Sequence, residues 1–247
     1  MAHELELAAP LLASMAVAAA ALSARLTAWL PPHALQRWLP WLQAMAAGLL
    51  LGDALLHLLP EAMANGVSPN RAGECVALGL LCLLGIECGM RGTGSSAIAV
   101  FARMDIVGDV LHHLADGMVI GAAFAIDHAL GFVVSLAVLM HELPREAGNA
   151  GVLIAGGYEP RKAFFNSVAT TLAIPLGALC IASLGNSSTL LGPALAVAAG
   201  TTLYLASSDI LPGLWSTLGR NHRFTPLAGV AGGMGFMWLA ATFDHVH

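Results

Sequence analysis

Charge is scarce in this sequence. Only 10% of its 247 residues are aspartate, glutamate, lysine or arginine, whereas soluble globular domains carry about 25%. Hydrophobic residues make up 57% of the chain, and the mean hydropathy is +0.77. A chain of this length that is so apolar does not fold around one water-soluble core. The composition therefore indicates a protein of the lipid bilayer, and no nucleic-acid partner is expected.

Cysteine is also rare, and the four cysteines form no CxxC pair. A free cysteine inside an apolar segment packs like a small hydrophobic residue. We therefore assign the cysteines to packing and expect no disulfide framework. The residues are Cys75, Cys82, Cys88 and Cys180.

Long apolar segments fill most of the chain. A helix rises about 1.5 Å per residue, so about 20 apolar residues cross the hydrocarbon layer. Alternating strands of about 10 residues, which would indicate a membrane barrel, do not occur. The sequence predicts an all-α polytopic membrane protein with eight transmembrane helices in a single domain, residues 1–247. The eight spans run over 6–29, 40–60, 73–91, 104–126, 130–156, 162–184, 189–211 and 225–243.

The first span begins HELELAAP and lacks the basic residues that open a signal peptide, so we expect it to be retained. Basic loops stay in the cytoplasm, and with eight spans nearly all basic loop residues fall on one side. Both termini are therefore predicted to be non-cytoplasmic, and the small size suggests a bacterial inner membrane. The basic residues of the cytoplasmic side are Arg25, Arg37, Arg91, Arg103, Arg161, Lys162, Arg220 and Arg223.

Two segments of the chain resemble each other. Residues 48–60 read GLLLGDALLHLLP and residues 200–212 read GTTLYLASSDILP, and an ungapped alignment places His57 opposite Asp209. An inverted repeat of spans 1–3 and 6–8 around spans 4 and 5 would leave this similarity, and such repeats are common in transporters.

The fourth and fifth spans carry ionisable residues at membrane depth, where a charge costs several kcal/mol and is usually paired or functional. Histidines and carboxylates recur about one turn apart, so each helix presents a row of nitrogen and oxygen ligands. Such a mixed set suits zinc first, with iron, manganese and cadmium as further cations. The candidate ligands are His112, His113 and Asp116 in span four, and His141, Glu142 and Glu146 in span five.

Further polar residues suggest a path to this site. Asp53, His57 and Glu61 follow one another at intervals of one turn in the second span, and Asp109 and Asp209 add carboxylates in spans four and seven. They would form either a metal path or a polar seam that fixes helix packing. In span five, Pro144 is expected to kink the helix and free a carbonyl group.

The motifs resemble those of the ZIP (Zrt/Irt-like) family of metal transporters, in the branch that carries HELP in its fifth span. The matching text is GDALLHLLPEA, GDVLHHLADGMVIGAAF, HELPREAGNAGVLIAGG, EPRKAFFNS and GTTLYLASSDILPG. The resemblance implies inward movement of divalent metal, chiefly zinc, through a binuclear site between spans four and five. It also implies a moving unit of spans 1, 4, 5 and 6 against a scaffold of 2, 3, 7 and 8, in a homodimer.

The chain departs from the family pattern at three positions. His113 stands where asparagine is usual, and Asn149 stands where a carboxylate is usual. Arg145 stands where a ligand would bridge two metals, and a guanidinium has no lone pair to give. We expect Arg145 to take the second metal's place and to pair with Asp116, Glu142 or Glu146, leaving one metal on His112, Asp116 and His141. In the alternative interpretation, Arg145 extends toward the cytoplasmic interface by snorkelling.

Two other functions are compatible with parts of this sequence. His141 and Glu142 open an HExxH motif of zinc hydrolases, but its last position is Arg145. An intramembrane zinc-dependent hydrolase is therefore the alternative function, with the missing ligand supplied by His112 or His113. A structural or receptor-like membrane protein is the other alternative. The transporter interpretation is preferred, and an enzyme is not expected.

Overall fold

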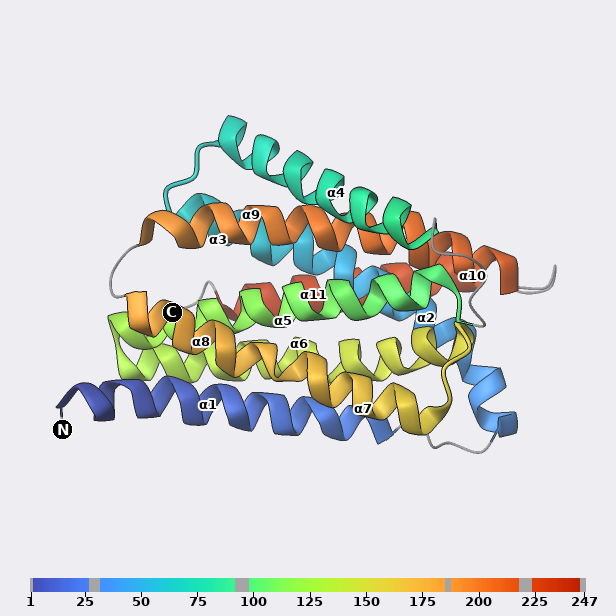
Figure 1. Ribbon diagram of the computed structural model, residues 1–247, viewed down its shortest axis with the longest axis horizontal. Coiled ribbons are helices and arrows are strands. Elements are labelled where there is room, and N and C mark those ends of the chain that lie inside the picture. The colour runs from blue at the N-terminus through green and yellow to red at the C-terminus, as the bar shows by residue number, and fades with distance from the viewer. Residues whose placement is uncertain (1, 27–31, 92–97, 185–187, 218–223, 245–247) are drawn as a thin grey trace.

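The chain forms a bundle of long helices in the computed structural model (Figure 1), which describes residues 2–26, 32–91, 98–184, 188–217 and 224–244. These residues contain no β-strand, in agreement with the predicted all-α fold. The helices are α1 (Ala2–Ala24), α2 (Pro32–Asp53), α3 (Leu59–Ala64), α4 (Pro69–Arg91), α5 (Val100–Ile126), α6 (His128–Ala155), α7 (Pro160–Thr171), α8 (Ala173–Leu184), α9 (Ser188–Tyr204), α10 (Leu211–Thr217) and α11 (Thr225–Asp244).

Each segment predicted to span the membrane is helical over nearly all of its described residues. The second span comprises α2 and α3 and begins earlier than predicted, and the sixth is divided into α7 and α8 at Leu172. Within the described residues, six helical stretches are long and apolar enough to cross a membrane. They are Leu7–Ala24, Pro40–Ala64, Pro69–Arg91, Val100–Ile126, Pro160–Ala182 and Thr189–Ser208.

Helix α6 is not among those six, although it has 28 residues and would extend about 42 Å. Its composition is the reason, because Glu142, Arg145 and Glu146 lie in its middle. All three side chains are buried, so the charges face protein and not lipid. The helix continues through Pro144.

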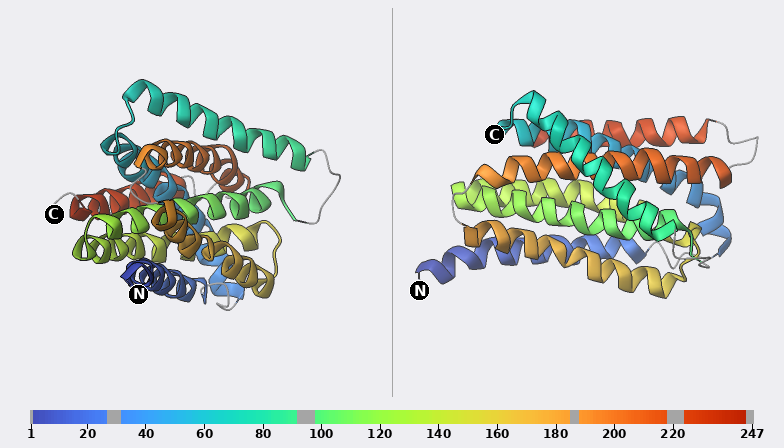
Figure 2. Two further views of the ribbon diagram at one scale, coloured as in Figure 1. Left: turned by 60° about the vertical axis from the view of Figure 1, so that its left-hand side comes forward. Right: turned by 45° about the horizontal axis from the view of Figure 1, so that its top comes forward.

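Helices α5 and α6 lie in the middle of the bundle. Helix α4 packs on α9 at one edge, and α1 packs on α6 and α8 at the opposite edge (Figures 1 and 2). Helix α6 also contacts α2, and α5 contacts α8 and α9. The start of α1 and the end of α11 lie at the same end of the bundle, next to the α5–α6 junction (Figures 1 and 2).

Glycines bring α5 and α8 into backbone contact. A Cβ atom at Gly117 would lie 1.9 Å from the carbonyl oxygen of Ile174, and one at Gly177 would lie 2.1 Å from that of Leu114. Small residues allow this approach where no hydrophobic effect drives helices together in lipid. The polar face of α5 is therefore held at a defined position.

The two similar sequence segments share a local distortion. A π-helical turn covers Ala54–Leu58 in the first and Leu205–Ile210 in the second, and each is followed directly by a Leu-Pro pair. Proline lacks the amide hydrogen that would continue the regular ladder, so a wider turn forms before it. In the first segment the π-helical turn begins directly after Asp53 and includes His57.

Candidate metal centre

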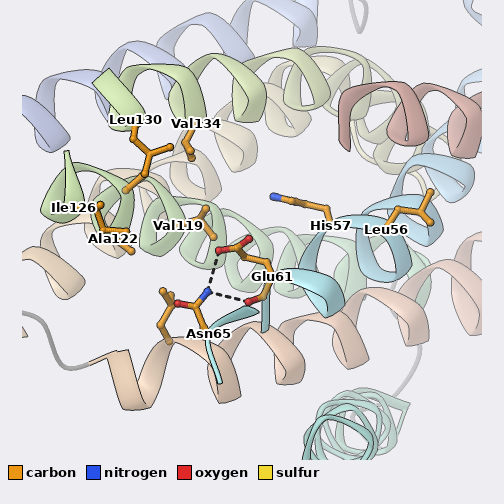
Figure 3. A pocket seen from close by; sticks show the side chains of 11 residues that line it. Leu56, His57, Glu61, Asn65, Val119, Ala122, Ile126, Leu130 and Val134 are labelled. Carbon is orange, nitrogen blue, oxygen red and sulfur yellow. Dashed lines mark hydrogen bonds between the residues drawn. The ribbon is translucent and has the colours of Figure 1, made fainter. Parts of the chain in front are cut away.

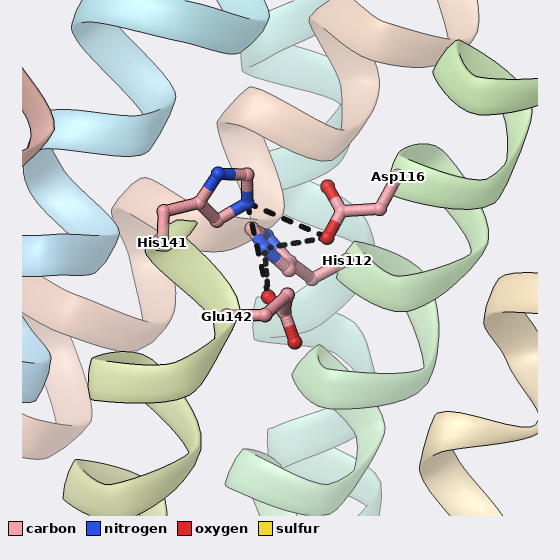
Figure 4. A group of neighbouring side chains, drawn as sticks. All are labelled: His112, Asp116, His141 and Glu142. Atoms are coloured by element: carbon pink, nitrogen blue, oxygen red, sulfur yellow. Dashed lines mark ion pairs between the residues drawn. The ribbon is translucent and has the colours of Figure 1, made fainter. Parts of the chain in front are cut away.

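The polar faces of α5 and α6 meet in the interior of the bundle. Helix α5 contributes His112 and Asp116, one turn apart, and α6 contributes the adjacent His141 and Glu142. All four side chains are buried, and none is more than 3% exposed. Figure 4 shows them pointing toward a common point from both helices.

The distances within this group match the spacing of ligands around zinc. Nε2 of His112 lies 3.5 Å from Oδ2 of Asp116 and 3.3 Å from Oε1 of Glu142. Nε2 of His141 lies 3.5 Å and 3.8 Å from the same two oxygens. Ligands about 2.0–2.2 Å from a tetrahedral zinc ion are about 3.3–3.6 Å from one another. Three of the four separations fall in this range and the fourth, 3.8 Å, is slightly longer, so the four atoms lie near the corners of a zinc coordination sphere.

These ligand atoms have few other partners. Nε2 of His112, Nε2 of His141 and both carboxylate oxygens of Asp116 make no hydrogen bond, although they are buried. Buried polar atoms are normally hydrogen-bonded, because leaving one unsatisfied costs about 1–3 kcal/mol. A cation at the centre of the group would satisfy all of them together.

Asp53 supports this group from α2. Its Oδ2 lies 3.3 Å from Nδ1 of His112, the ring nitrogen that faces away from the ligand cluster. Its Oδ1 is hydrogen-bonded to Nδ1 of His57 over 3.0 Å. Asp53, His57 and His141 also offer ligand atoms within 4.8 Å of one another. The predicted path residues Asp53 and His57 thus lie next to the ligand cluster.

A cavity of about 170 Å³ continues from His57 toward the α5–α6 junction (Figure 3). Glu61 lies on its wall, and Asn65 donates a 2.9 Å hydrogen bond to the Glu61 carboxylate. The remaining lining is apolar and comes mainly from α5 and α6. Its residues are Leu56, Val119, Ala122, Ala123, Ile126, Leu130, Val134 and Leu191. The side chain of Asp209, the other predicted path residue of the seventh span, lies outside the described residues.

A second polar cluster lies on the other side of Glu142. Ligand atoms of Asp109, His113 and Glu146 lie within 4.8 Å of one another, and all three residues are buried. Nη1 of Arg145 contacts Oδ1 of Asp109 at 2.6 Å, and its Nε contacts Oε1 of Glu142 at 2.6 Å. Nε2 of His113 lies 2.9 Å from Oε2 of Glu142 and 2.7 Å from Nη2 of Arg145.

Arg145 is 1% exposed, so the interpretation in which it snorkels toward the cytoplasmic interface is wrong. It pairs with Glu142 and Glu146, as predicted, and also with Asp109. Three carboxylates surround one guanidinium, and their combined attraction holds it away from the interface.

Arg25 was counted from the sequence as a cytoplasmic loop residue, and that assignment is also wrong. It follows the last residue of α1 and is 1% exposed. Its Nη2 lies 2.8 Å from Oδ2 of Asp109, and its Nε contacts Oε2 of Glu146. No sequence signal distinguished it from a loop arginine, because its partners lie 84 and 121 residues further along the chain.

Other buried polar residues near this cluster were also missed. Thr170 donates a hydrogen bond to Asp109 over 3.5 Å. Asn149, named from the sequence only as a departure from the family pattern, donates to Asp109 over 2.5 Å. Asp105 precedes Asp109 by one helical turn and is fully buried, and neither of its carboxylate oxygens has a hydrogen-bond partner. The spacing of Asp105 from Asp109 was the available signal.

Comparison with known proteins identifies the family. The family model described as ZIP zinc transporter matches residues 87–241, which include α5, α6 and both polar clusters. The chain belongs to the ZIP family of zinc transporters. Members of this family are transporters, not enzymes, and the apolar helices agree with an integral membrane protein.

Curated ZIP relatives resemble part or most of the chain. Zinc transporter foi of Drosophila melanogaster is 36% identical over 148 residues, which are 60% of this chain and 21% of the fly protein. Zinc transporter zipt-7.1 of Caenorhabditis briggsae is 25% identical over 289 residues, covering 86% of this chain and 73% of that protein. Zinc transporter ZIP4 of Homo sapiens is 37% identical over 120 residues, covering 49% of this chain and 18% of the human protein. This ZIP chain thus spans only about a fifth of the fly and human relatives.

Proposed function

We propose that this ZIP protein transports zinc across a membrane through the site formed by His112, Asp116, His141 and Glu142. The observation that carries the proposal is that ligand atoms of His112, Asp116 and His141 are buried without a hydrogen bond and lie 3.3–3.8 Å from Oε1 of Glu142 or from one another. Neutral imidazole and carboxylate ligands bind zinc and release it more readily than thiolates. Iron, manganese and cadmium are the further cations that this donor set would accept.

Transport runs into the cytoplasm in this proposal. The cavity beside Glu61 lies at the end of the bundle where α1 begins and α11 ends (Figures 1 and 3), and the sequence predicts that end to be non-cytoplasmic. Zinc would enter past Glu61, pass to Asp53 and His57, and reach His141, which belongs to both neighbouring ligand groups. Asp209 would take up zinc beyond the site, whereas Asp109, whose two carboxylate oxygens accept hydrogen bonds from Arg145 and Arg25, would act by holding these arginines.

The membrane arrangement completes the proposal. The protein has eight spans with both termini outside the cytoplasm, in a bacterial inner membrane, and functions as a homodimer. Spans 1–3 and 6–8 form an inverted repeat, which the paired π-helical turns before Pro60 and Pro212 support. Spans 1, 4, 5 and 6 move against spans 2, 3, 7 and 8, since both polar clusters lie chiefly on α5 and α6.

The site holds one metal. Arg145 places a permanent positive charge beside Glu142, Glu146 and Asp109, and a guanidinium both repels a second dication and provides no lone pair. The ligand groups His113 and Glu146 then serve to hold Arg145 in place of a second metal.

Zinc uptake into proteoliposomes tests the proposal. The wild-type protein should show saturable uptake of radioactive zinc, with manganese, iron and cadmium as competitors, and His141→Ala should reduce it by more than about tenfold because a metal ligand is lost. His128→Ala is the matched control, since His128 is an exposed histidine of the same helix. Absence of uptake of any of these metals by folded wild-type protein would contradict the proposal.

A further inference from the structure

We infer that Arg25 and Arg145 together fill a second metal position made by Asp109, His113 and Glu146, and that zinc binds there only when both guanidiniums are removed. This inference rests on the proposed zinc site at His112 and His141. It assigns to Arg25, a residue of the first span, control over how many metal ions the transporter holds.

The two guanidiniums divide the same carboxylates between them. Arg145 contacts Oδ1 of Asp109, and Arg25 contacts Oδ2. Arg25 contacts Oε2 of Glu146, and Nη2 of Arg145 lies 3.6 Å from Oε1. Three of the four carboxylate oxygens therefore accept hydrogen bonds from an arginine. The fourth, Oε1 of Glu146, has no hydrogen-bond partner, so a metal would find one open oxygen beside two permanent positive charges.

His113, the one histidine of this second metal position, is in contact with Arg145 as well. Nε2 of His113 lies 2.7 Å from Nη2 of Arg145 and 3.2 Å from Oε1 of Glu146. A neutral imidazole has one nitrogen with a free lone pair. Nε2 of His113 also lies 2.9 Å from Oε2 of Glu142, so it faces Arg145 and two carboxylates, and a cation could approach it only in the space that Arg145 vacates.

Removing Arg145 alone does not empty the position. Arg25 would still contact Asp109 and Glu146, and a buried guanidinium cannot lose its proton. With both arginines replaced, the two buried carboxylates of Asp109 and Glu146 would lack a countercharge, and the imidazole of His113 would lose its contact with Arg145. Buried carboxylates in that condition require a cation, because an unpaired buried charge is strongly destabilising. The buried Oδ1 of Asn149, which has no hydrogen-bond partner, is a further oxygen near the vacated space.

Zinc content per protomer, measured on monodisperse purified protein equilibrated with zinc, tests the inference. The wild-type protein, Arg145→His and Arg25→Gln should each hold one zinc ion, and the Arg25→Gln/Arg145→His double variant should hold two. Adding Asp109→Asn to the double variant should return it to one. Arg25→Lys/Arg145→Lys, which keeps both charges, should hold one, as should Arg161→Gln, which changes an exposed arginine.

Two zinc ions in Arg145→His alone would overturn the inference, because Arg145 would then be sufficient to block the position. One zinc ion in a folded double variant would also overturn it. If Arg25→Gln/Arg145→His does not fold, Arg25→His/Arg145→His serves the same purpose, since histidine can either pair with the acids or bind metal.

The His141→Ala change separates this inference from the proposed function. In the double variant it should remove the zinc held by the first site and leave one ion that depends on Asp109. A wild-type protein without zinc would contradict the proposed function, and a double variant that then gains one Asp109-dependent ion would still support the inference. If neither the wild-type protein nor the folded double variant binds zinc, both the proposed function and the inference are wrong.

Discussion

Nδ1 of His112 lies 3.3 Å from Oδ2 of Asp53, so a carboxylate on α2 faces the ring nitrogen opposite the one that points into the proposed zinc site. The two buried atoms are close, and neither has a hydrogen-bond partner. A carboxylate that accepts the N–H of a ligating histidine orients the ring and fixes its tautomer, and its loss typically lowers metal affinity by about 10–100-fold. Asp53 also holds His57, so it links the proposed entry path to the site.

Asp53→Ala should therefore weaken zinc binding by about 10–100-fold without removing a direct ligand of the His112 site. The measurement is a competition titration with a zinc chelator of known affinity. Glu159→Gln, an exposed carboxylate at the start of α7, should leave the affinity unchanged. An Asp53→Ala affinity equal to wild type would show that His112 is oriented by other contacts.

Substitutions of Glu142 and of Asp116 should have different effects on the stability of the zinc-free protein. Glu142 accepts hydrogen bonds from Nε and Nη2 of Arg145, at 2.6 Å and 2.9 Å. Glu142→Gln leaves that buried guanidinium with weaker partners, and breaking a buried ion pair costs about 3–5 kcal/mol. We expect loss of zinc and a lower free energy of unfolding in the zinc-free protein.

Asp116→Asn should also abolish zinc binding, but the zinc-free protein should be at least as stable as wild type. Neither oxygen of Asp116 has a hydrogen-bond partner, and an unpaired buried carboxylate is costly to keep. Thermal unfolding of both variants with and without zinc compares them. Equal destabilisation of the two zinc-free variants would contradict the distinct roles assigned to the two acids.

Filling the cavity should slow transport and leave the zinc site intact. Ala122 lines the cavity, so Ala122→Phe places a ring in the proposed entry path. Ala125 is exposed on the same helix, and Ala125→Phe is the matched control. Initial zinc uptake should fall by more than tenfold in the first variant only, while zinc content after long equilibration stays at the wild-type value. Undiminished uptake would place the entry path elsewhere.

The α5–α8 contact should not tolerate a methyl group. A Cβ at Gly117 would lie 1.9 Å from the carbonyl oxygen of Ile174, whereas a Cβ at Gly85 would meet nothing within 4 Å. Gly117→Ala should lower the free energy of unfolding by at least about 1–3 kcal/mol, the usual cost of overpacking. Gly85→Ala should have little effect. Thermal unfolding in detergent compares the two, and a Gly117→Ala protein of wild-type stability would contradict the close approach.

The helices and the principal ligand cluster followed from local patterns. Apolar length predicts a helix, and histidine and carboxylate one turn apart predict a shared face, so His112 and Asp116 could be grouped from spacing alone. The rows on α5 and α6 could then be expected to meet, because an ionisable residue in lipid requires a polar partner.

The sequence by itself determined that the chain is helical, that it is too apolar for water, and that α5 and α6 carry histidines and carboxylates about one turn apart. These properties depend on hydrophobicity and on the helical repeat, which act over a few residues. Only the tertiary structure decided which charges neutralise one another. Arg25 looked like a loop residue, yet it lies buried against Asp109 and Glu146, and Arg145 turns inward to the same acids. Charge pairing depends on distance in space, and helix packing brings together residues that are more than eighty positions apart in the chain.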